Sequence, residues 1–302
     1  MADAFEIAEE VRAAIDRGPG AVALETSVIG QGLPVPRNAE CVTRMSGAIR
    51  AAGAVPAWIG TVDGRLVVGL DDGQLARFCE PGVAAKVARR DLPAAVATRV
   101  LGATTVSATI WAAARAGVPV GATGGIGGVH PGEDPDVSAD LLELARTPGL
   151  LVCSGPKSII DPVATAERLE ELGVVTVGHV VDRLPFFLAP HAPVELEHVV
   201  ASAAEAAAFA DAAFALGTRS TILLANPVPA ASAMDVDEVA AAAADAEARA
   251  DAAGVGGKAR TPFLLSALAE LTGGRSLEAN LALLEDNARV AAEVAVALAE
   301  RR

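Results

Sequence analysis

The residue types best suited to chemistry gather in one stretch, which runs from Ala122 to Ile160. It begins with a glycine-dense turn that ends at His130, continues through an acidic segment, and reaches Lys157 shortly after an apolar run. Glycines let a backbone approach a ligand closely or adopt positive φ. Carboxylates hold metals or transfer protons, and a lysine amine is a nucleophile. This combination predicts a site within the stretch.

The glycine turn, with Gly124, Gly125, Gly127 and Gly128, matches neither common nucleotide-binding motif. It lacks the GK[ST] of a P-loop, and its spacing is not GxGxxG. Glycines that follow a strand can still present backbone N–H groups to a phosphate. The alternative is a tight turn from strand to loop with no ligand, and the sequence leaves both interpretations open.

Two aspartates in the acidic segment, Asp136 and Asp140, lie four residues apart. If the segment is helical they share one face of the helix, and oxygen ligands on one face suit Mg²⁺ or Mn²⁺ with water completing the octahedron. The alternative is helix capping, because Asp136 or Ser138 is a good N-cap for the leucine-rich helix that follows.

Three further residues have both a functional and an ordinary interpretation. Lys157 is expected on the first turn of a helix over 158–172, where the helix dipole and partial burial would lower its pKa and favour a nucleophilic amine. Lys86 lies in a small basic island and is either a solvated charge or a phosphate contact. Glu25 ends the apolar strand 21–24, where a carboxylate is costly unless it is partnered or functional.

Strand and helix signals alternate along the chain. Strands are expected at 21–24, at 56–70 as a hairpin around Asp63 and Gly64, and at 118–122, 149–152, 174–178 and 221–225. Helices are expected at 5–17, 38–52, 71–79, 92–100, 104–117, 158–172, 201–216, 235–253, 261–272 and 276–300. Residues 182–193 form a loop rich in proline and aromatic residues, which is a candidate lid. The alternation predicts an α/β fold with a mainly parallel sheet covered on both faces, in a single domain over 1–302.

Composition narrows the class of protein. Lys and Arg number 24 against 38 Asp and Glu, a net charge of −14 that favours solubility and disfavours broad contact with nucleic acid or an anionic membrane. The three cysteines show no metal-like spacing, which suits a reducing cytosol. The N-terminal segment lacks the features of a signal peptide, and the most apolar helical run contains Glu205 and Asp211. We expect a soluble cytoplasmic protein.

Several segments, taken together and in order, resemble the pseudouridine-5′-phosphate glycosidase family, which includes the indigoidine synthase A-like proteins. The resemblance extends from about residue 5 through the rest of the chain. It is carried by ALETSVIGQGLPVPRN (23–38), KVARRDLP (86–93), ATTVSATIWAAARAGVPV (103–120), ATGGIGGVH (122–130), DVSADLLELARTP (136–148), SGPKSIID (154–161), LLANPVP (223–229), GKARTPFLLSALAELTGG (257–274) and SLEANLALLEDNARVAAEVA (276–295).

The resemblance implies a three-layer α/β/α sandwich, a homotrimer, a bound Mn²⁺, and cleavage of pseudouridine 5′-phosphate to uracil and ribose 5-phosphate. It implies that Lys157 is the nucleophile that forms an imine with the opened sugar, that Glu25 is the proton donor, and that Asp136 is the metal ligand. The segment that meets the substrate beside the metal matches Ser138, Ala139 and Asp140. Other substrate-binding positions match Lys86, Val106, Thr123, His130 and Asn280.

The chain departs from the family pattern at three places. Pro131 follows His130 where relatives commonly carry arginine, the loop 186–192 lacks the usual Ser-Gly, and ALETS replaces the common ALEST. These departures concern loop geometry and substrate range more than the lysine chemistry. The alternatives are a glycosidase for another C-nucleotide, as in pigment biosynthesis, a non-catalytic nucleotide-phosphate binding protein, and a sugar kinase.

Overall fold

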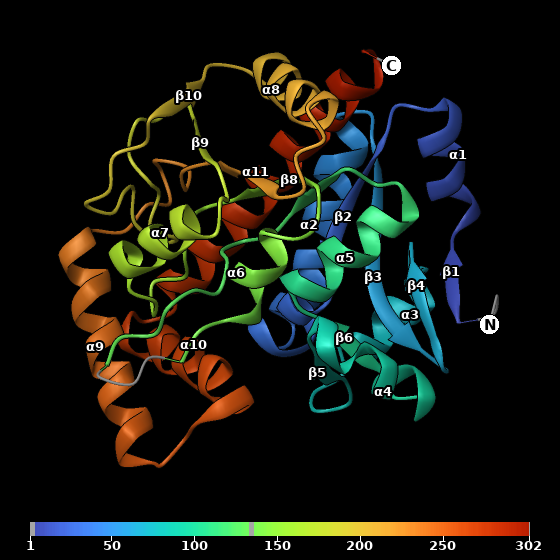
Figure 1. Cartoon of the computed structure of the whole chain (residues 1–302). Coiled ribbons are helices and arrows are strands. Elements are labelled where there is room, and N and C mark those ends of the chain that lie inside the picture. The colour runs from blue at the N-terminus through green and yellow to red at the C-terminus, as the bar shows by residue number, and fades with distance from the viewer. Residues whose placement is uncertain (1–3, 133–135, 302) are drawn as a thin grey trace.

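A computed structural model describes residues 4–132 and 136–301. A sheet of eleven strands runs through this part of the chain, in the order β1-β4-β3-β2-β7-β8-β11-β9-β10, with β6 beside β3 and β5 beside β6 (Figure 1). The strands are β1 (Phe5–Ile7), β2 (Ala21–Glu25), β3 (Val55–Val62), β4 (Arg65–Val68), β5 (Ala85–Val87), β6 (Gly102–Thr104), β7 (Val120–Ala122), β8 (Gly149–Cys153), β9 (Thr176–His179), β10 (His198–Val200) and β11 (Thr221–Ala225). Neighbouring strands are parallel, except that β3 runs antiparallel to β4 and β6. The predicted mainly parallel mixed sheet is confirmed.

Helices cover both faces of the sheet. They are α1 (Glu9–Arg17), α2 (Arg37–Ala51), α3 (Asp72–Phe78), α4 (Leu92–Ala97), α5 (Val106–Ala116), α6 (Ala139–Leu144), α7 (Pro162–Glu171), α8 (Ala203–Ala215), α9 (Val236–Ala252), α10 (Arg260–Leu271) and α11 (Arg275–Ala299). Short helical turns lie at Val28–Gly32, a π-helix called η1 here, and at Arg89–Asp91 and Gly257–Ala259. This is the three-layer α/β/α arrangement that the resemblance implied.

The side chains of each central strand point alternately into two separate hydrophobic cores. In β2, Val22 and Leu24 point into one core, whereas Ala21 and Ala23 point into the other. Successive side chains of a strand face opposite sides of a sheet, so a strand buried on both sides must be apolar throughout. This explains why β2, β8 and β11 appear in the sequence as short continuous apolar runs rather than alternating ones.

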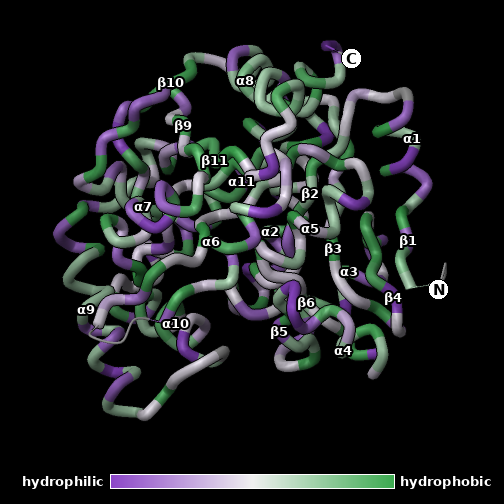
Figure 2. Tube along the Cα trace, in the orientation of Figure 1, coloured by the Kyte–Doolittle hydropathy of each residue, from purple (hydrophilic) through white to green (hydrophobic). Residues whose placement is uncertain are grey.

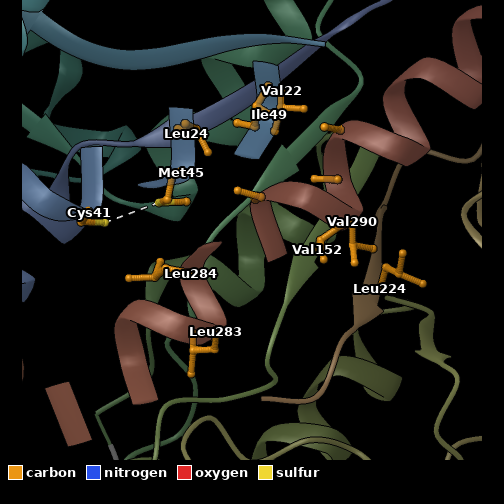
Figure 3. Packing of buried hydrophobic residues seen from close by; sticks show 14 of the residues in the cluster. Val22, Leu24, Cys41, Met45, Ile49, Val152, Leu224, Leu283, Leu284 and Val290 are labelled. Carbon is orange, nitrogen blue, oxygen red and sulfur yellow. Dashed lines mark hydrogen bonds between the residues drawn. The ribbon is translucent and has the colours of Figure 1, made fainter. Parts of the chain in front are cut away.

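The first core lies between the sheet and helices α2, α8 and α11. Figure 3 shows residues of this core from α2, α11 and the strands β2, β8 and β11. Apolar residues recur along α11 at helical spacing, among them Leu284, Ala288, Ala291 and Leu298, so one stripe of the helix faces the strands and its neighbouring helices. Each fully buried leucine stabilises the fold by about 1.5–3 kcal/mol relative to leaving it exposed. Small residues dominate elsewhere in the stripe and allow α2 and α8 to pack closely against α11.

The second face of the sheet is covered by α1, α4 and α5 on one half and by α6 and α7 on the other. The helical pair α9 and α10 forms a smaller core with Ile159 and Ile160 and extends beyond the sheet (Figure 1). Hydrophilic residues concentrate on the outer turns of helices such as α1 and α9 and in loops (Figure 2). None of the helices in the described ranges combines the length and the apolar character needed to cross a membrane.

Some predicted elements were wrong. Residues 5–17 were expected to form one helix, but Phe5–Ile7 pairs with β4 as an edge strand and α1 begins only at Glu9. The three-residue strands β5, β6 and β10 were missed, because so short a segment has no periodicity to detect. The hairpin at Asp63 and Gly64 is confirmed, with both residues at positive φ as the tight turn requires.

Two other errors concern the surroundings of the candidate site. The helix expected over 158–172 begins only at Pro162, because the preceding segment pairs with the glycine turn through bridges at Pro156 and Asp161. The loop 182–193 is not an exposed lid, since Phe186, Phe187 and Leu188 are buried in the first core.

Candidate active site

A cavity of about 860 Å³ opens at the carboxyl ends of β2, β7 and β8. Ligands of open α/β sheets bind at this edge, outside the carboxyl ends of the strands. All eleven residues that the sequence and the resemblance assigned to a site line this one cavity. They are Glu25, Lys86, Val106, Thr123, His130, Asp136, Ser138, Ala139, Asp140, Lys157 and Asn280.

Glu25 is the last residue of β2, and its side chain is held in a fixed orientation. The residue is only 5% exposed, yet both carboxylate oxygens have partners. Ser27 Oγ donates a hydrogen bond to Oε2 at 2.5 Å, and Thr123 Oγ1 donates one to Oε1. Two hydroxyl donors offset much of the cost of burying the carboxylate and fix which way it points. Glu25 is therefore a partnered carboxylate facing the cavity.

The glycine turn packs tightly against neighbouring segments and uses most of its own N–H groups internally. Five of the eight N–H groups from 123 to 130 donate to acceptors within the protein, namely those of Thr123, Ile126, Gly127, Val129 and His130. A Cβ at Gly127 would lie 2.4 Å from Ser138 Oγ, and one at Gly128 would lie 2.3 Å from Thr165 Oγ1. Close packing, more than anion binding, therefore requires these two glycines.

Gly124 and Gly125 differ from the rest of the turn. Both line the cavity, and their N–H groups donate to no residue in the described part of the chain. The sequence suggested that the whole turn could offer N–H groups to a phosphate. Over the residues that the structure describes, only these two N–H groups of the turn lie on the cavity wall and are available for that role. Both remain suitable donors to an anionic oxygen.

Asp140 and Asp136 have different surroundings. Helix α6 begins after Ser138, whose Oγ accepts a hydrogen bond from the N–H of Asp140 at 3.2 Å. Asp136 lies outside the helix, so the condition for a shared helical face is not met, and the capping alternative is confirmed at Ser138. The buried Asp140 carboxylate accepts hydrogen bonds from the N–H groups of Ser107 at 3.0 Å and Gly127 at 3.1 Å. It braces the start of α5 against the glycine turn.

Asp136 is the residue best placed to hold a cation. It is exposed, lines the cavity, and its carboxylate accepts no hydrogen bond from the residues that the structure describes. Over the same residues, 4–132 and 136–301, no group of three or more His, Cys, Asp or Glu is arranged to hold a metal. A single free carboxylate fits a hydrated hard cation such as Mn²⁺ or Mg²⁺, which keeps most of its waters, and does not fit a cage of protein ligands.

Lys157 lies in the loop between β8 and α7 and lines the cavity with Glu25. Its backbone is fixed at both ends, because its N–H donates to Ile126 O at 3.1 Å and its carbonyl accepts from the N–H of Ile160 at 2.9 Å. The predicted position on the first turn of a helix was wrong. Asp161 caps α7 instead, so the positive end of that helix is already occupied by a carboxylate.

His130 also lines the cavity. Burial is the main cause that lowers the pKa of its imidazole, although Glu247 and Asp136 act in the opposite direction. Its Nδ1 lies 3.8 Å from Glu247 Oε1, and Glu247 also pairs with Arg260. Burial favours the neutral ring.

Three buried polar atoms on residues that line the cavity have no hydrogen-bond partner within the described residues. They are His130 Nδ1, Asn280 Oδ1 and Gln31 Oε1. The amide of Gln31 is anchored, because its Nε2 donates to Ala84 O at 2.8 Å. Buried polar atoms without partners are rare in folded proteins, and at a cavity wall they are expected to bind a ligand.

The lining of the cavity also contains residues that the sequence did not reveal as site residues. Ser27 and Gln31 lie close to Glu25 in the chain, and Phe187 comes from the altered loop. Within the described residues, six Lys and Arg line the cavity against four Asp and Glu, although acids predominate in the whole chain. The basic ones are Lys86, Arg89, Arg90, Arg146, Lys157 and Arg168. Of these, the sequence pointed to Lys157 and to the cluster around Lys86, but not to Arg146 or Arg168.

Comparisons with known proteins give matches that cover nearly the whole chain. The family model described as Indigoidine synthase A like protein matches residues 10–297. A pseudouridine-5′-phosphate glycosidase of Methylobacterium nodulans is 46% identical over 300 residues, which are 97% of this chain and 88% of that protein. Another, of Herpetosiphon aurantiacus, is 47% identical over 294 residues and 97% of each chain.

Two crystal structures have the same fold. An indigoidine synthase A-like protein from Thermotoga maritima superposes with a TM-score of 0.90 at 36% identity, over 99% of this chain and 98% of that one. The prealnumycin C-glycosynthase AlnA, in complex with ribulose 5-phosphate, superposes with a TM-score of 0.89 at 40% identity, again over 99% and 98% of the two chains.

Proposed function

The chain belongs to the indigoidine synthase A-like family, and we propose that it cleaves the C–C glycosidic bond of pseudouridine 5′-phosphate to uracil and ribose 5-phosphate. The observation that carries the proposal is that an oriented, buried carboxylate and a lysine amine line the same cavity. Glu25 supplies the first and Lys157 the second. Such a pair suits the chemistry of this bond better than two carboxylates.

A C–C glycosidic bond has no oxygen or nitrogen leaving group to protonate, so the carboxylate pair of ordinary sugar hydrolases is insufficient. In the proposed mechanism Glu25 donates a proton to the ring oxygen of ribose as the C1′–O4′ bond breaks. The amine of Lys157 forms a bond to C1′ and gives up a proton to the Glu25 carboxylate. Its lone pair then expels C5 of uracil, which takes that proton from Glu25, and leaves an iminium at C1′. Water hydrolyses the iminium to ribose 5-phosphate and the free amine, and the proton released in this step returns to Glu25.

Recognition of the phosphate is assigned to the basic part of the lining. Lys86 provides a charge, and Gly124 and Gly125 provide N–H donors to the phosphate oxygens. The surplus of basic residues in the cavity of a chain with a net charge of −14 supports an anionic substrate. Asn280 and His130, which also line the cavity, supply further polar contacts.

We propose that Asp136 binds Mn²⁺ with water as its other ligands. The ion, when bound, would fix the substrate oxygens and ordered water beside Ser138 and Ala139. A homotrimer and a cytoplasmic location, which the resemblance and the composition imply, stay predictions.

The direct test is to incubate the protein with pseudouridine 5′-phosphate and Mn²⁺ and to measure free uracil. Borohydride added during turnover should trap a ribose-phosphate adduct on Lys157, located by peptide mass mapping. Lys157→Arg keeps the charge but forms no productive imine, so it should bind substrate with almost no turnover. Lys86→Ala is the matched lysine control and should mainly weaken binding. An adduct on Lys86, or an active Lys157→Ala without any adduct, would contradict the mechanism.

A second candidate is the reverse chemistry with another carbon nucleophile. The solved relative that supports it is named as a C-glycosynthase and holds ribulose 5-phosphate. The loop 186–192, which differs from the family pattern, places Phe187 on the cavity wall. Offering ribose 5-phosphate with uracil and, separately, with other electron-rich ring compounds distinguishes the two. Product formed only with uracil supports the glycosidase.

A further inference from the structure

Asn287 is a completely buried amide on α11 that lies behind the cavity rather than on its wall. Its Nδ2 donates to Thr123 O at 2.8 Å and to Ser154 Oγ at 3.1 Å. Its Oδ1 accepts from Asn226 Nδ2 at 2.9 Å. The carbonyl of Thr123 can only accept, and the amide of Asn226 donates here, so the orientation of the Asn287 amide is fixed by its partners.

The three partners stand just beyond the carboxyl ends of three adjacent strands. Thr123 follows β7, Ser154 follows β8, and Asn226 follows β11. One side chain therefore ties together the carboxyl ends of β7, β8 and β11, and the first two of these border the cavity. Asn226 is itself held, because its Oδ1 lies 2.8 Å from His179 Nδ1 and its Nδ2 also donates to Asp286.

The connection continues from Thr123 to Glu25. The Thr123 N–H donates to Val152 O at 3.0 Å and its carbonyl accepts from Asn287, so the backbone of this residue is fixed from two sides. Its hydroxyl then donates to Glu25 Oε1. A shift of the Thr123 backbone would move this hydroxyl and allow the Glu25 carboxylate to rotate about the remaining hydrogen bond from Ser27.

We propose that Asn287 is a positioning residue for the reaction, acting through Thr123 on the orientation of Glu25. The inference rests on the proposed role of Glu25 as proton donor. Asn287 does not touch the substrate, since it does not line the cavity. Its Nδ2 also lies 3.4 Å from Gly124 O, but the bond to Thr123 O is much shorter, at 2.8 Å. Its main effect is therefore on the alignment of the acid with the ring oxygen, in the chemical step rather than in substrate binding.

The test is a double-mutant cycle. Asn287→Leu and Thr123→Val are made singly and together, and kcat and KM for uracil release are measured for each. Asn287→Leu should lower kcat on the order of 10²-fold, as misplacement of a catalytic group by about 1 Å does, with KM changed less than about threefold. In the Thr123→Val background the same change should lower kcat by no more than about threefold, because the hydroxyl that transmits its effect is absent.

A matched control separates positioning from simple loss of a buried hydrogen bond. Thr221 Oγ1 donates to Thr147 O at 2.6 Å at the opposite, amino end of β11, and Thr221→Val removes that bond. It should lower the free energy of unfolding while kcat of the folded enzyme stays within about twofold of wild type. If Asn287→Leu does not fold, Asn287→Asp, which keeps the shape but loses both N–H donors, takes its place in the cycle.

The outcomes are distinguishable. A wild type that releases no uracil overturns the proposed function and this inference with it. An active wild type in which the effects of Asn287 and Thr123 on kcat multiply independently overturns the positioning role alone. So does an Asn287 variant whose kcat matches that of Thr221→Val, because its role would then be only structural.

Discussion

The substitution Asp140→Asn tests whether Asp140 holds neighbouring segments of the protein together or contacts the substrate. The resemblance places Asp140 in the segment that meets the substrate, whereas the structure shows both carboxylate oxygens accepting backbone N–H groups, from Ser107 and Gly127. A hydrogen bond to a charged group contributes about 1.5–3 kcal/mol net. In Asp140→Asn one oxygen becomes an NH₂ group that opposes an N–H donor. One such bond is lost and the donor left behind is buried.

Ser107 adds a smaller contribution. It is the second residue of α5, so the Asp140 carboxylate also lies at the positive end of that helix, which is worth about 0.3–1 kcal/mol. Together these effects predict that Asp140→Asn lowers the free energy of unfolding by about 2–4 kcal/mol. That loss leaves a typical domain folded, because domains are stable by about 5–15 kcal/mol.

Equilibrium unfolding in urea measures the loss, with uracil release assayed on the folded variant. Asp136→Asn is the control, because Asp136 is exposed and accepts no hydrogen bond from the described residues; its stability should stay within about 0.5 kcal/mol of wild type. An Asp140→Asn protein with wild-type stability and no activity would refute the bracing argument and support a direct contact between Asp140 and the substrate.

Three other experiments have expected outcomes. Burial lowers the pKa of His130 in the folded protein below its ordinary 6.5. As the pH falls below that value, the unfolded chain therefore binds more protons than the folded protein does. The free energy of unfolding should therefore fall from about pH 6.5 downward, and urea titrations of His130→Gln should show a shallower fall; an unchanged slope contradicts this. Gly128→Ala, with its Cβ 2.3 Å from Thr165 Oγ1, should cost about 1–3 kcal/mol, whereas Gly47→Ala, in mid-helix with open space around it, should gain about 0.5–1 kcal/mol in the same unfolding assay. A chelator should abolish uracil release, Mn²⁺ should restore it, and Asp136→Ala should mimic the chelator; full activity of the metal-free protein would exclude the metal.

Long apolar and amphipathic segments were predicted well from the sequence. The strand Thr221–Ala225 was predicted to the residue, because its apolar run is bounded by a turn and by a proline-containing exit. The boundaries of α9, α10 and α11 differ from those predicted by one residue. In each case the signal is local, and it is long enough for its period to be detected.

Features that depend on distant partners could not be predicted. Whether the N–H groups of the glycine turn are free depends on Gly155, Thr165 and Asp140, and nothing in the turn itself reveals these acceptors. His130 likewise meets Glu247, more than a hundred residues later in the chain. The eleven residues named from the sequence line one cavity, and the ordered set of motifs, rather than any single spacing, pointed to them; their individual roles stay predictions.

The position of α11 has a consequence for synthesis of the protein on the ribosome. This helix covers one face of β2, β7 and β8, yet it begins roughly 120 residues after β8 ends at Cys153. At translation rates of about 5–20 residues per second, α11 is synthesised on the order of 10 s after the strands that it covers. Val22, Leu24 and Val152 are exposed during that interval, so the emerging chain presents an apolar sheet face that a ribosome-associated chaperone would recognise. This face of the strands is covered only after the segment that carries Asn280 and Asn287 has been synthesised, so the cavity, which Asn280 lines, is completed last.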